Sequence, residues 1–229
     1  MRPLADRRSH FRFPLDFTFG SPSSVRILRA LARQDRPVGT TELAAKTHLN
    51  QSGLRRTLKL LMQEGLVEAS GVERGATYRL AAAHPLRAGL DALFVAEEQR
   101  VERVLSAVRR AASSITPPLD AVWLYGSVAR GNDQVGSDFD LAIVVANDHG
   151  VDDAVDTMRN ALTATEASER VEISILGLSR EDVMRLADGD PWWNVVRAEA
   201  VPLVGSAPEV VRQRFAASAA RTARRGRPT

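Results

Sequence analysis

The chain of 229 residues contains no cysteine, so it has neither a disulfide framework nor a thiolate for metal binding or nucleophilic catalysis. Its four histidines are scattered and show no ligand spacing for zinc. No apolar run approaches the roughly 20 residues that span a bilayer, and the N-terminus lacks the apolar core of a secretory signal. These absences predict a cytoplasmic protein with no membrane association.

Lysine is scarce as well: Lys46 and Lys59 are the only two, and arginine supplies the other basic residues. A GC-rich genome produces the same bias, and the net charge of +3 is small for this length, so arginine richness is weak evidence for a nucleic-acid partner. The arginines crowd both ends of the chain: Arg2, Arg7, Arg8, Arg12, Arg221, Arg224, Arg225 and Arg227. We expect a basic arm over 1–20 and a basic, partly disordered helix or tail over 207–229.

The most informative stretch is 126–141, GSVARGNDQVGSDFDL. An apolar strand pattern, AVWLY, ends at Gly126, and a second one, FDLAIVV, follows Asp138. Side chains at i and i+2 of a strand leave the same face, so Asp138 and Asp140 converge on one point. Because glycine allows close approach to a phosphate and magnesium takes carboxylate and phosphate oxygens, the stretch predicts a metal–nucleotide site.

Gly126-Ser127, Arg130-Gly131 and Ser137-Asp138-x-Asp140-Leu141 resemble the signature of the minimal nucleotidyltransferases of the DNA-polymerase-β-like superfamily. The resemblance implies that Asp138 and Asp140 bind magnesium, with two ions expected. It also implies that Gly126 and Ser127 hold a nucleoside triphosphate, and Ser137 joins them as a nucleotide-binding residue. Arg130 either neutralises phosphate charge or only covers the first helix turn.

The same resemblance implies a third carboxylate on a neighbouring strand, as metal ligand or general base. Residues 170–176, RVEISIL, have strand character, and Glu172 falls where that carboxylate belongs. Glutamate in place of aspartate extends the reach by one methylene. The alternative is that Glu172 is a solvated residue on an edge strand.

Residues 21–84 show a different pattern of short amphipathic helices followed by a hairpin. Helices are predicted over 24–33, 41–47 and 51–65, with Thr40 or Thr41 capping the second and Gly65 ending the third. Apolar residues share one face of the third helix: Leu54, Leu58, Leu61 and Met62. Strands over 66–70 and 77–80 then form a wing around a GVERG turn.

This order resembles a winged helix-turn-helix domain of the bacterial regulator type, which implies a DNA duplex as partner and places the third helix in the major groove. The candidate DNA-binding residues are Gln51, Ser52, Arg55, Arg56, Lys59 and, on the wing, Arg74. The alternatives are that these charges form a solvated helix face, or that the domain binds another protein.

A long helix over 85–116 is expected to connect this domain to the nucleotidyltransferase domain at 117–206. Its apolar stripe either pairs with a second subunit or packs against the nucleotidyltransferase domain: Leu86, Leu90, Leu93, Phe94, Val101, Val104, Leu105 and Val108. Trp192 and Trp193 either stack a base or acceptor, or pack a core. The fold class is therefore α+β with two domains, a winged helix-turn-helix and a small α/β domain with a mixed sheet.

The expected function is magnesium-dependent transfer of a nucleoside monophosphate, AMP from ATP, to a hydroxyl on a protein, nucleic acid or small molecule, coupled to DNA binding. Proteins with this resemblance include antibiotic-modifying enzymes and antitoxins that adenylylate a HEPN-type ribonuclease toxin. Such a toxin is therefore one candidate acceptor, and a toxin–antitoxin role is one of the expected functions. The alternative is a transcriptional regulator whose nucleotidyltransferase fold senses a nucleotide or mediates assembly without turnover.

Overall fold

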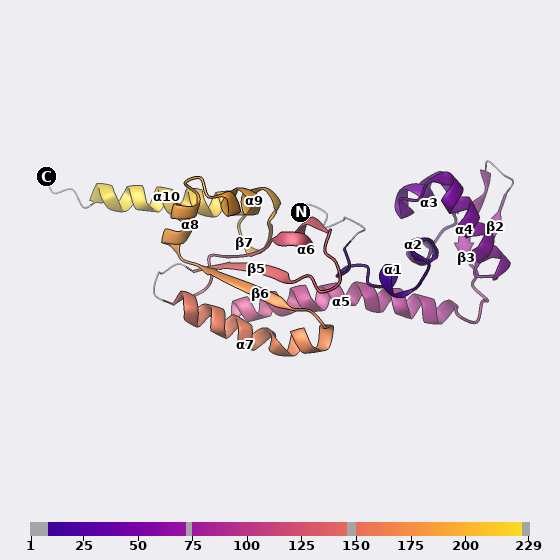
Figure 1. Cartoon of the computed structure of the whole chain (residues 1–229), viewed down its shortest axis with the longest axis horizontal. Coiled ribbons are helices and arrows are strands. Elements are labelled where there is room, and N and C mark those ends of the chain that lie inside the picture. The colour runs from indigo at the N-terminus through magenta and orange to yellow at the C-terminus, as the bar shows by residue number, and fades with distance from the viewer. Residues whose placement is uncertain (1–8, 72–74, 146–149, 226–229) are drawn as a thin grey trace. The chain divides into compact units, whose positions relative to one another are not determined.

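The computed structural model describes residues 9–71, 75–145 and 150–225, with side chains as far as residue 221, and it divides into two compact units. One unit is Arg12–Arg100, and the other is the chain up to Phe11 together with Val101–Thr229. In sequence, the first unit is thus inserted between two parts of the second. The helix α5 (Arg87–Ser113) contributes to both (Figure 1).

The Arg12–Arg100 unit is a winged helix-turn-helix fold, as predicted. Its helices before α5 are α1 (Leu15–Thr18), α2 (Pro22–Ala32), α3 (Thr40–Thr47) and α4 (Gln51–Gln63). Its antiparallel sheet has the order β1-β3-β2, with β1 (Val38–Gly39), β2 (Val67–Ser70) and β3 (Thr77–Leu80). The short strand β1 was not expected from the sequence.

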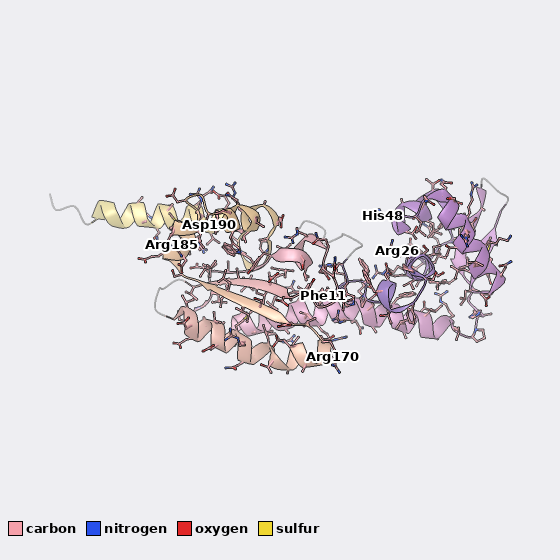
Figure 2. All side chains as sticks on the ribbon, in the orientation of Figure 1. Phe11, Arg26, His48, Arg170, Arg185 and Asp190 are labelled. Atoms are coloured by element: carbon pink, nitrogen blue, oxygen red, sulfur yellow. The ribbon has the colours of Figure 1, made fainter. Side chains whose placement is uncertain are left out.

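The turn between α3 and α4 follows from two local features. His48 adopts the left-handed conformation that ends α3, with φ of 51° (Figure 2). The Asn50 side chain then accepts a hydrogen bond from Gly53 N at 2.7 Å and caps α4. The prediction that Thr40 or Thr41 caps α3 is wrong, because Gly39 is the N-cap and no side chain caps that helix.

The buried face of α4 differs by one residue from the prediction. Leu54, Leu58 and Leu61 are buried, but Met62 is 37% exposed and Thr57 is buried in its place. The Thr57 hydroxyl donates to Gly53 O at 2.9 Å, so its burial leaves no polar group unsatisfied. A local hydrogen bond therefore allows a polar residue at an edge of the apolar stripe.

Residues 9–20 do not form the expected arm. Ser9 and Phe11 are buried, and α1 follows them. Asp16 of α1 is also buried and forms an ion pair with Arg29 of α2 at 2.8 Å, while Arg29 pairs with the buried Glu97 of α5 at 2.6 Å. This three-charge network fastens α1, α2 and the first part of α5 to one another.

The apolar stripe of α5 is divided between two cores. Leu90 and Phe94 pack in the core of the winged-helix unit, whereas Val104 and Val108 are buried in the core of the other unit. Leu86, at 61% exposure, stays outside. The predicted packing against the nucleotidyltransferase domain accounts for Val104 and Val108, whereas the packing of Leu90 and Phe94 in the winged-helix core was in neither alternative. Pairing with a second subunit stays a prediction.

The second unit is built on a four-stranded mixed sheet with the order β6-β5-β4-β7. The strands are β4 (Ala121–Leu124), β5 (Phe139–Val144), β6 (Ile173–Leu178) and β7 (Val201–Gly205), and only β5 and β6 run parallel. The helices are α6 (Gly126–Arg130), α7 (Val151–Glu169), α8 (Arg180–Leu186), α9 (Pro191–Glu199) and α10 (Pro208–Arg225). None of the helices in the described ranges is long and apolar enough to cross a membrane.

Both faces of the central strands are buried, which explains their nearly continuous apolar sequence. α5 and α7 cover one face, and α8, α9 and α10 lie over the other (Figure 1). Trp193 of α9 is 2% exposed and packs edge-on against Trp123 of β4, with ring centroids 6.0 Å apart. Trp193 is therefore a core residue, as the packing alternative predicts.

The third strand begins later than the sequence suggests. Arg170, expected to open it, has a left-handed backbone with φ of 51° and ends α7 (Figure 2). The strand β6 starts at Ile173, so Glu172 precedes it. The β-branched run alone does not reveal where the preceding helix stops.

Candidate functional site

Gly126 is held in the left-handed region, with φ of +73°, where the chain turns from β4 into α6. A Cβ at this position would overlap Asp140 Oδ2 and lie 3.0 Å from Asp140 Cγ. Both the backbone angle and the space require glycine. The close approach also places the Asp140 carboxylate directly beside the start of α6.

Asp138 and Asp140 flank Phe139, whose side chain is 1% exposed and points into the core. The alternation of the strand turns both carboxylates away from that core. Asp140 lies within β5 and is partly buried, whereas Asp138 immediately precedes the strand and is exposed. The structure therefore brings the two predicted metal ligands onto one side of β5.

The electrostatics of Asp140 match such a pair. Burial, and then the like charge of Asp138, raise the pKa of Asp140 above its ordinary value, although Arg130 acts in the opposite direction. Burial and then the charge of Asp140 likewise raise the pKa of Tyr125. The charged form of Asp140 is thus destabilised on balance, because burial and Asp138 together outweigh the opposing charge of Arg130.

Glu172 lies on the same side as the aspartates by the register of the sheet. Asp140 pairs with Ser174 in the parallel ladder, and Phe139 N donates to Glu172 O at 2.7 Å, which sets Glu172 beside Asp138. Its side chain is exposed. Across the part of the chain that the structure describes, no three side chains of His, Cys, Asp or Glu come together closely enough to hold a metal. The role of Glu172 remains a prediction.

The other predicted nucleotide-binding residues lie around α6 and the following loop. Arg130 Nη1 donates to Glu199 Oε2 of α9 at 2.8 Å, on the surface. The Ser137 hydroxyl accepts a hydrogen bond from Gln134 N at 2.9 Å and so closes the turn before Asp138. Ser127 lies in the first turn of α6 and is partly buried. No side chain caps this helix, which leaves its first N–H groups directed at the loop.

A divalent cation fits the two aspartates. Their like charges lie close enough to raise the pKa of Asp140, and Gly126 keeps the space beside Asp140 Oδ2 free of any side chain. Two carboxylates that leave room for phosphate oxygens and water are the ligand set that magnesium takes in nucleotide-dependent enzymes. Asp138 and Asp140 are the residues that would hold it.

The predicted DNA-binding residues of α4 share one exposed surface. All five are exposed: Gln51, Ser52, Arg55, Arg56 and Lys59. Among the described residues, no carboxylate forms an ion pair with Arg55, Arg56 or Lys59, so their charges are available to phosphate groups. Arg74, predicted on the wing, lies outside the described residues.

Family models match both halves of the chain. Residues 24–71 match the IclR helix-turn-helix domain, and residues 113–186 match the polymerase beta nucleotidyltransferase domain. The chain is a fusion of these two domain types. No curated protein matches it.

Two solved structures resemble parts of this fusion weakly. A crystal structure of a toxin–antitoxin with AMP-PNP is 14% identical with a TM-score of 0.34, over 52% of this chain and 88% of that one. The human N-acetylserotonin methyltransferase in complex with SAM is 18% identical with a TM-score of 0.23, over 48% of this chain and 37% of that one. Likenesses this weak say nothing about function.

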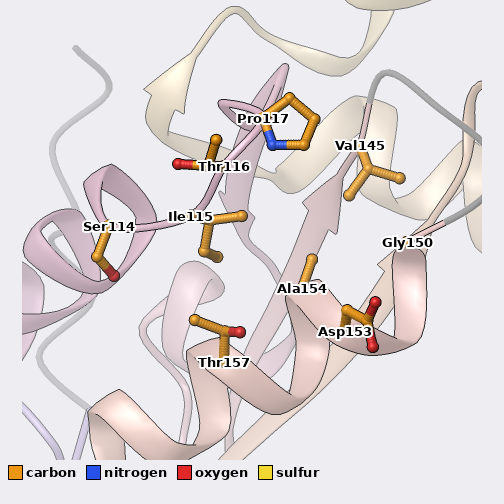
Figure 3. Close-up of a pocket in the computed structure, with 9 residues that line it drawn as sticks. All are labelled: Ser114, Ile115, Thr116, Pro117, Val145, Gly150, Asp153, Ala154 and Thr157. Carbon is orange, nitrogen blue, oxygen red and sulfur yellow. The ribbon is translucent and has the colours of Figure 1, made fainter.

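The nucleotidyltransferase domain also has a cavity of about 270 Å³ between the end of α5, the end of β5 and the start of α7 (Figure 3). Ser114, Val145, Asp153 and Thr157 are among its lining residues. Val145 follows the last residue of β5, whereas Asp138 precedes its first. The cavity is therefore at the other end of the strand from the carboxylates and is not part of their site.

Sequence reasoning missed one aromatic residue beside the carboxylates, Tyr125. Tyr125 packs edge-on against Trp192, with ring centroids 5.5 Å apart, and its backbone N donates to Asp140 O at 3.0 Å. Trp192 is partly exposed, so the stacking alternative stays open for it. The available signal was the position of Tyr125, directly before the Gly-Ser pair of the nucleotidyltransferase motif.

Proposed function

We propose that this chain is a DNA-binding nucleotidyltransferase that moves a nucleoside monophosphate, AMP from ATP, to a hydroxyl group of an acceptor. The observation that carries the proposal is the placement of Asp140 against Gly126, with the like charge of Asp138 acting on it, in a domain that matches the polymerase beta nucleotidyltransferase model. Burial and the charge of Asp138 outweigh Arg130 and raise the pKa of Asp140, and a bound cation would stabilise such a pair.

In the proposed reaction, the acceptor oxygen forms a bond with the α-phosphorus while the bond from that phosphorus to the bridging oxygen breaks and pyrophosphate leaves. Asp138 and Asp140 would hold the magnesium ions, which when bound would stabilise charge on the phosphoryl and leaving oxygens. Gly126 and Ser127 orient the triphosphate through the loop, with Ser137 fixing its end. Glu172 takes the proton of the acceptor hydroxyl.

Arg130 has a defined part in this arrangement. Its guanidinium lowers the pKa of Asp140 and is held by Glu199, so it is a fixed positive charge beside the carboxylate pair. When a triphosphate binds, Arg130 neutralises part of its charge. Of the two readings of this residue, phosphate neutralisation is the one that its electrostatic effect on Asp140 supports.

The acceptor side of the site is open. Ser174 and Leu176 of β6 and Glu172, directly before the strand, are exposed, and alternation puts them on the face that carries Asp138 and Asp140. An exposed strand surface of this kind suits a macromolecular acceptor, and a HEPN-type toxin is one candidate. This proposal rests on the domain assignment and on the register of β5 and β6.

Glu172 is exposed, and among the described residues it forms no group of three potential metal ligands with the aspartates. This observation favours a second candidate function. In that case, the domain binds a nucleotide without turnover and serves as the sensor of a transcriptional regulator. The two candidates differ in whether a nucleotide is consumed.

The first prediction tests the transfer. The protein, incubated with magnesium, labelled nucleoside triphosphates and a cell lysate, is expected to label an acceptor, and Asp138→Ala and Asp140→Ala are each expected to reduce the labelling at least about 100-fold, since even outer-shell partners of metal ligands cost about 10- to 100-fold. Asp120→Ala, at an exposed ion pair with Arg214, is the matched control and should label normally. Nucleotide binding without labelled product would support the sensor instead.

A second prediction tests the DNA surface. The double variant Arg55→Ala, Arg56→Ala is expected to lose most salt-sensitive binding to duplex DNA. Each phosphate contact removed reduces the slope of the logarithm of the affinity against the logarithm of the salt concentration by about one. Fluorescence anisotropy with a labelled duplex at several salt concentrations measures this. The matched control is Arg109→Ala, Arg110→Ala, an exposed arginine pair on α5. Equal binding by all three proteins would exclude α4 as the DNA-binding surface.

A further inference from the structure

The loop that leads from α6 to the carboxylates is fastened by a segment from the start of the chain. Asp133, in this loop, is 1% exposed. Its side-chain Oδ2 accepts a hydrogen bond from Phe11 N at 2.6 Å, and its carbonyl oxygen accepts one from His10 N at 3.1 Å. Both partners belong to the part of the chain before Arg12, which lies in the nucleotidyltransferase unit.

The same segment also reaches the far end of the loop. The Phe11 ring packs edge-on against Phe139, with centroids 5.2 Å apart, and both residues are buried. Phe139 stands between Asp138 and Asp140. The segment therefore contacts the loop at Asp133, before the carboxylates, and again at the residue between them.

The other hydrogen bonds that the described residues show within this loop are local. Asn132 N donates to Ser127 O at 3.1 Å, and contacts between Gln134 and Ser137 close the turn, while Val135 at the tip is 74% exposed. Asp138 follows this loop and directly precedes Phe139, which is held in the ladder with β6, so the loop sets its position from one side and the sheet from the other. Displacement of Asp133 would pass to Asp138 within five residues of chain.

We propose that Asp133 is a positioning residue for the metal-binding carboxylates, and that residues 9–11 complete the nucleotidyltransferase site by holding it. Asp133 does not touch the metal or the substrate. It fixes the course of the loop so that Asp138 meets Asp140 at the distance that one divalent ion requires. This inference rests on the proposed function.

The test is the affinity of the full chain for Mn²⁺ alone, measured by isothermal titration calorimetry on variants that unfold well above the temperature of measurement. Asp133→Ala is expected to raise the Kd for Mn²⁺ about tenfold, in the range that supporting residues of metal sites cost. Asp133→Asn keeps an oxygen acceptor for Phe11 N and should stay within about twofold of the original protein. Asp120→Ala, in the same unit, is the control for general destabilisation.

Asp138→Ala separates this inference from the proposed function. If Asp138→Ala loses Mn²⁺ binding while Asp133→Ala binds normally, the positioning role is wrong and the metal site stands. If Asp138→Ala itself binds normally, the metal site is wrong and the positioning role with it. Equal weakening by Asp133→Ala and Asp133→Asn would also overturn the role of the Phe11 contact. Should Asp133→Ala fail to fold, Phe11→Leu, which keeps an apolar side chain, is expected to raise the Kd about threefold, and an unchanged Kd would overturn the inference.

Discussion

Replacing Gly126 with alanine is expected to damage both transfer and stability. The new Cβ would overlap Asp140 Oδ2, so either the carboxylate or the turn must move. A displacement of about 1 Å in a catalytic group costs on the order of 100-fold in rate. In addition, the left-handed φ of +73° becomes unfavourable for alanine by about 1–2 kcal/mol. We therefore expect at least a 100-fold loss of nucleotide transfer together with a lower free energy of unfolding.

Gly189→Ala is the control that separates these two effects. Gly189, between α8 and α9, also has a positive φ of +97°, but a Cβ there meets no atom within 4 Å. The variant should therefore show the backbone cost alone and retain transfer within about a few-fold. Labelled-product assays and urea unfolding of both variants measure the two quantities. If Gly126→Ala transferred nucleotide as well as Gly189→Ala, the close approach of Gly126 to Asp140 would have no catalytic meaning.

The features that the sequence predicts correctly are those with local causes. The Gly-Ser turn, the paired aspartates and the apolar strands around them lie within one stretch of chain, and the structure brings Gly126, Asp138 and Asp140 together as expected. The helices of the winged helix are also predicted from local patterns, such as the apolar face of α4 at Leu54, Leu58 and Leu61, although the predicted cap of α3 is wrong. The fold class and the two domain types are confirmed.

The features that the sequence misses depend on distant partners. Glu97 lies in a polar-looking stretch of α5, and only the fold shows that Arg29 and Asp16 surround it. The sequence predicts that Phe11 belongs to a basic arm, and only the fold shows that it contacts Asp133 and Phe139. The start of β6 depends on where α7 stops at Arg170, which the β-branched pattern does not encode. The sequence pattern therefore does not determine which face of the sheet Glu172 lies on, because a shift of one residue moves a strand residue to the other face.

The second prediction with a large effect concerns the winged-helix unit. Arg29→Ala is expected to lower its free energy of unfolding by about 3–5 kcal/mol, because the change leaves Glu97 buried without a positive partner and leaves Asp16 with the partly exposed Arg26 alone. Arg29 makes hydrogen bonds to Glu97 at 2.6 and 2.9 Å and to Asp16 at 2.8 Å, and all three side chains are at most 7% exposed. The Arg29 guanidinium also lies over the rings of Phe13 and Phe94. Arg26→Ala, which removes the partly exposed second partner of Asp16, should cost only about 1 kcal/mol or less.

The pH dependence of the loss identifies its cause. Burial raises the pKa of Glu97 above its ordinary value even with Arg29 opposing it, so removing Arg29 raises that pKa further. A raised pKa gives stability that is present at low pH and is lost as the pH rises through it. The deficit of Arg29→Ala should therefore be smaller in mildly acidic solution than at neutral pH. Far-ultraviolet circular dichroism follows the helices, whereas fluorescence reports only the nucleotidyltransferase unit, which contains Trp123, Trp192 and Trp193. A deficit that did not change with pH would mean that lost packing on Phe13 and Phe94, and not the stranded charges, destabilises the variant.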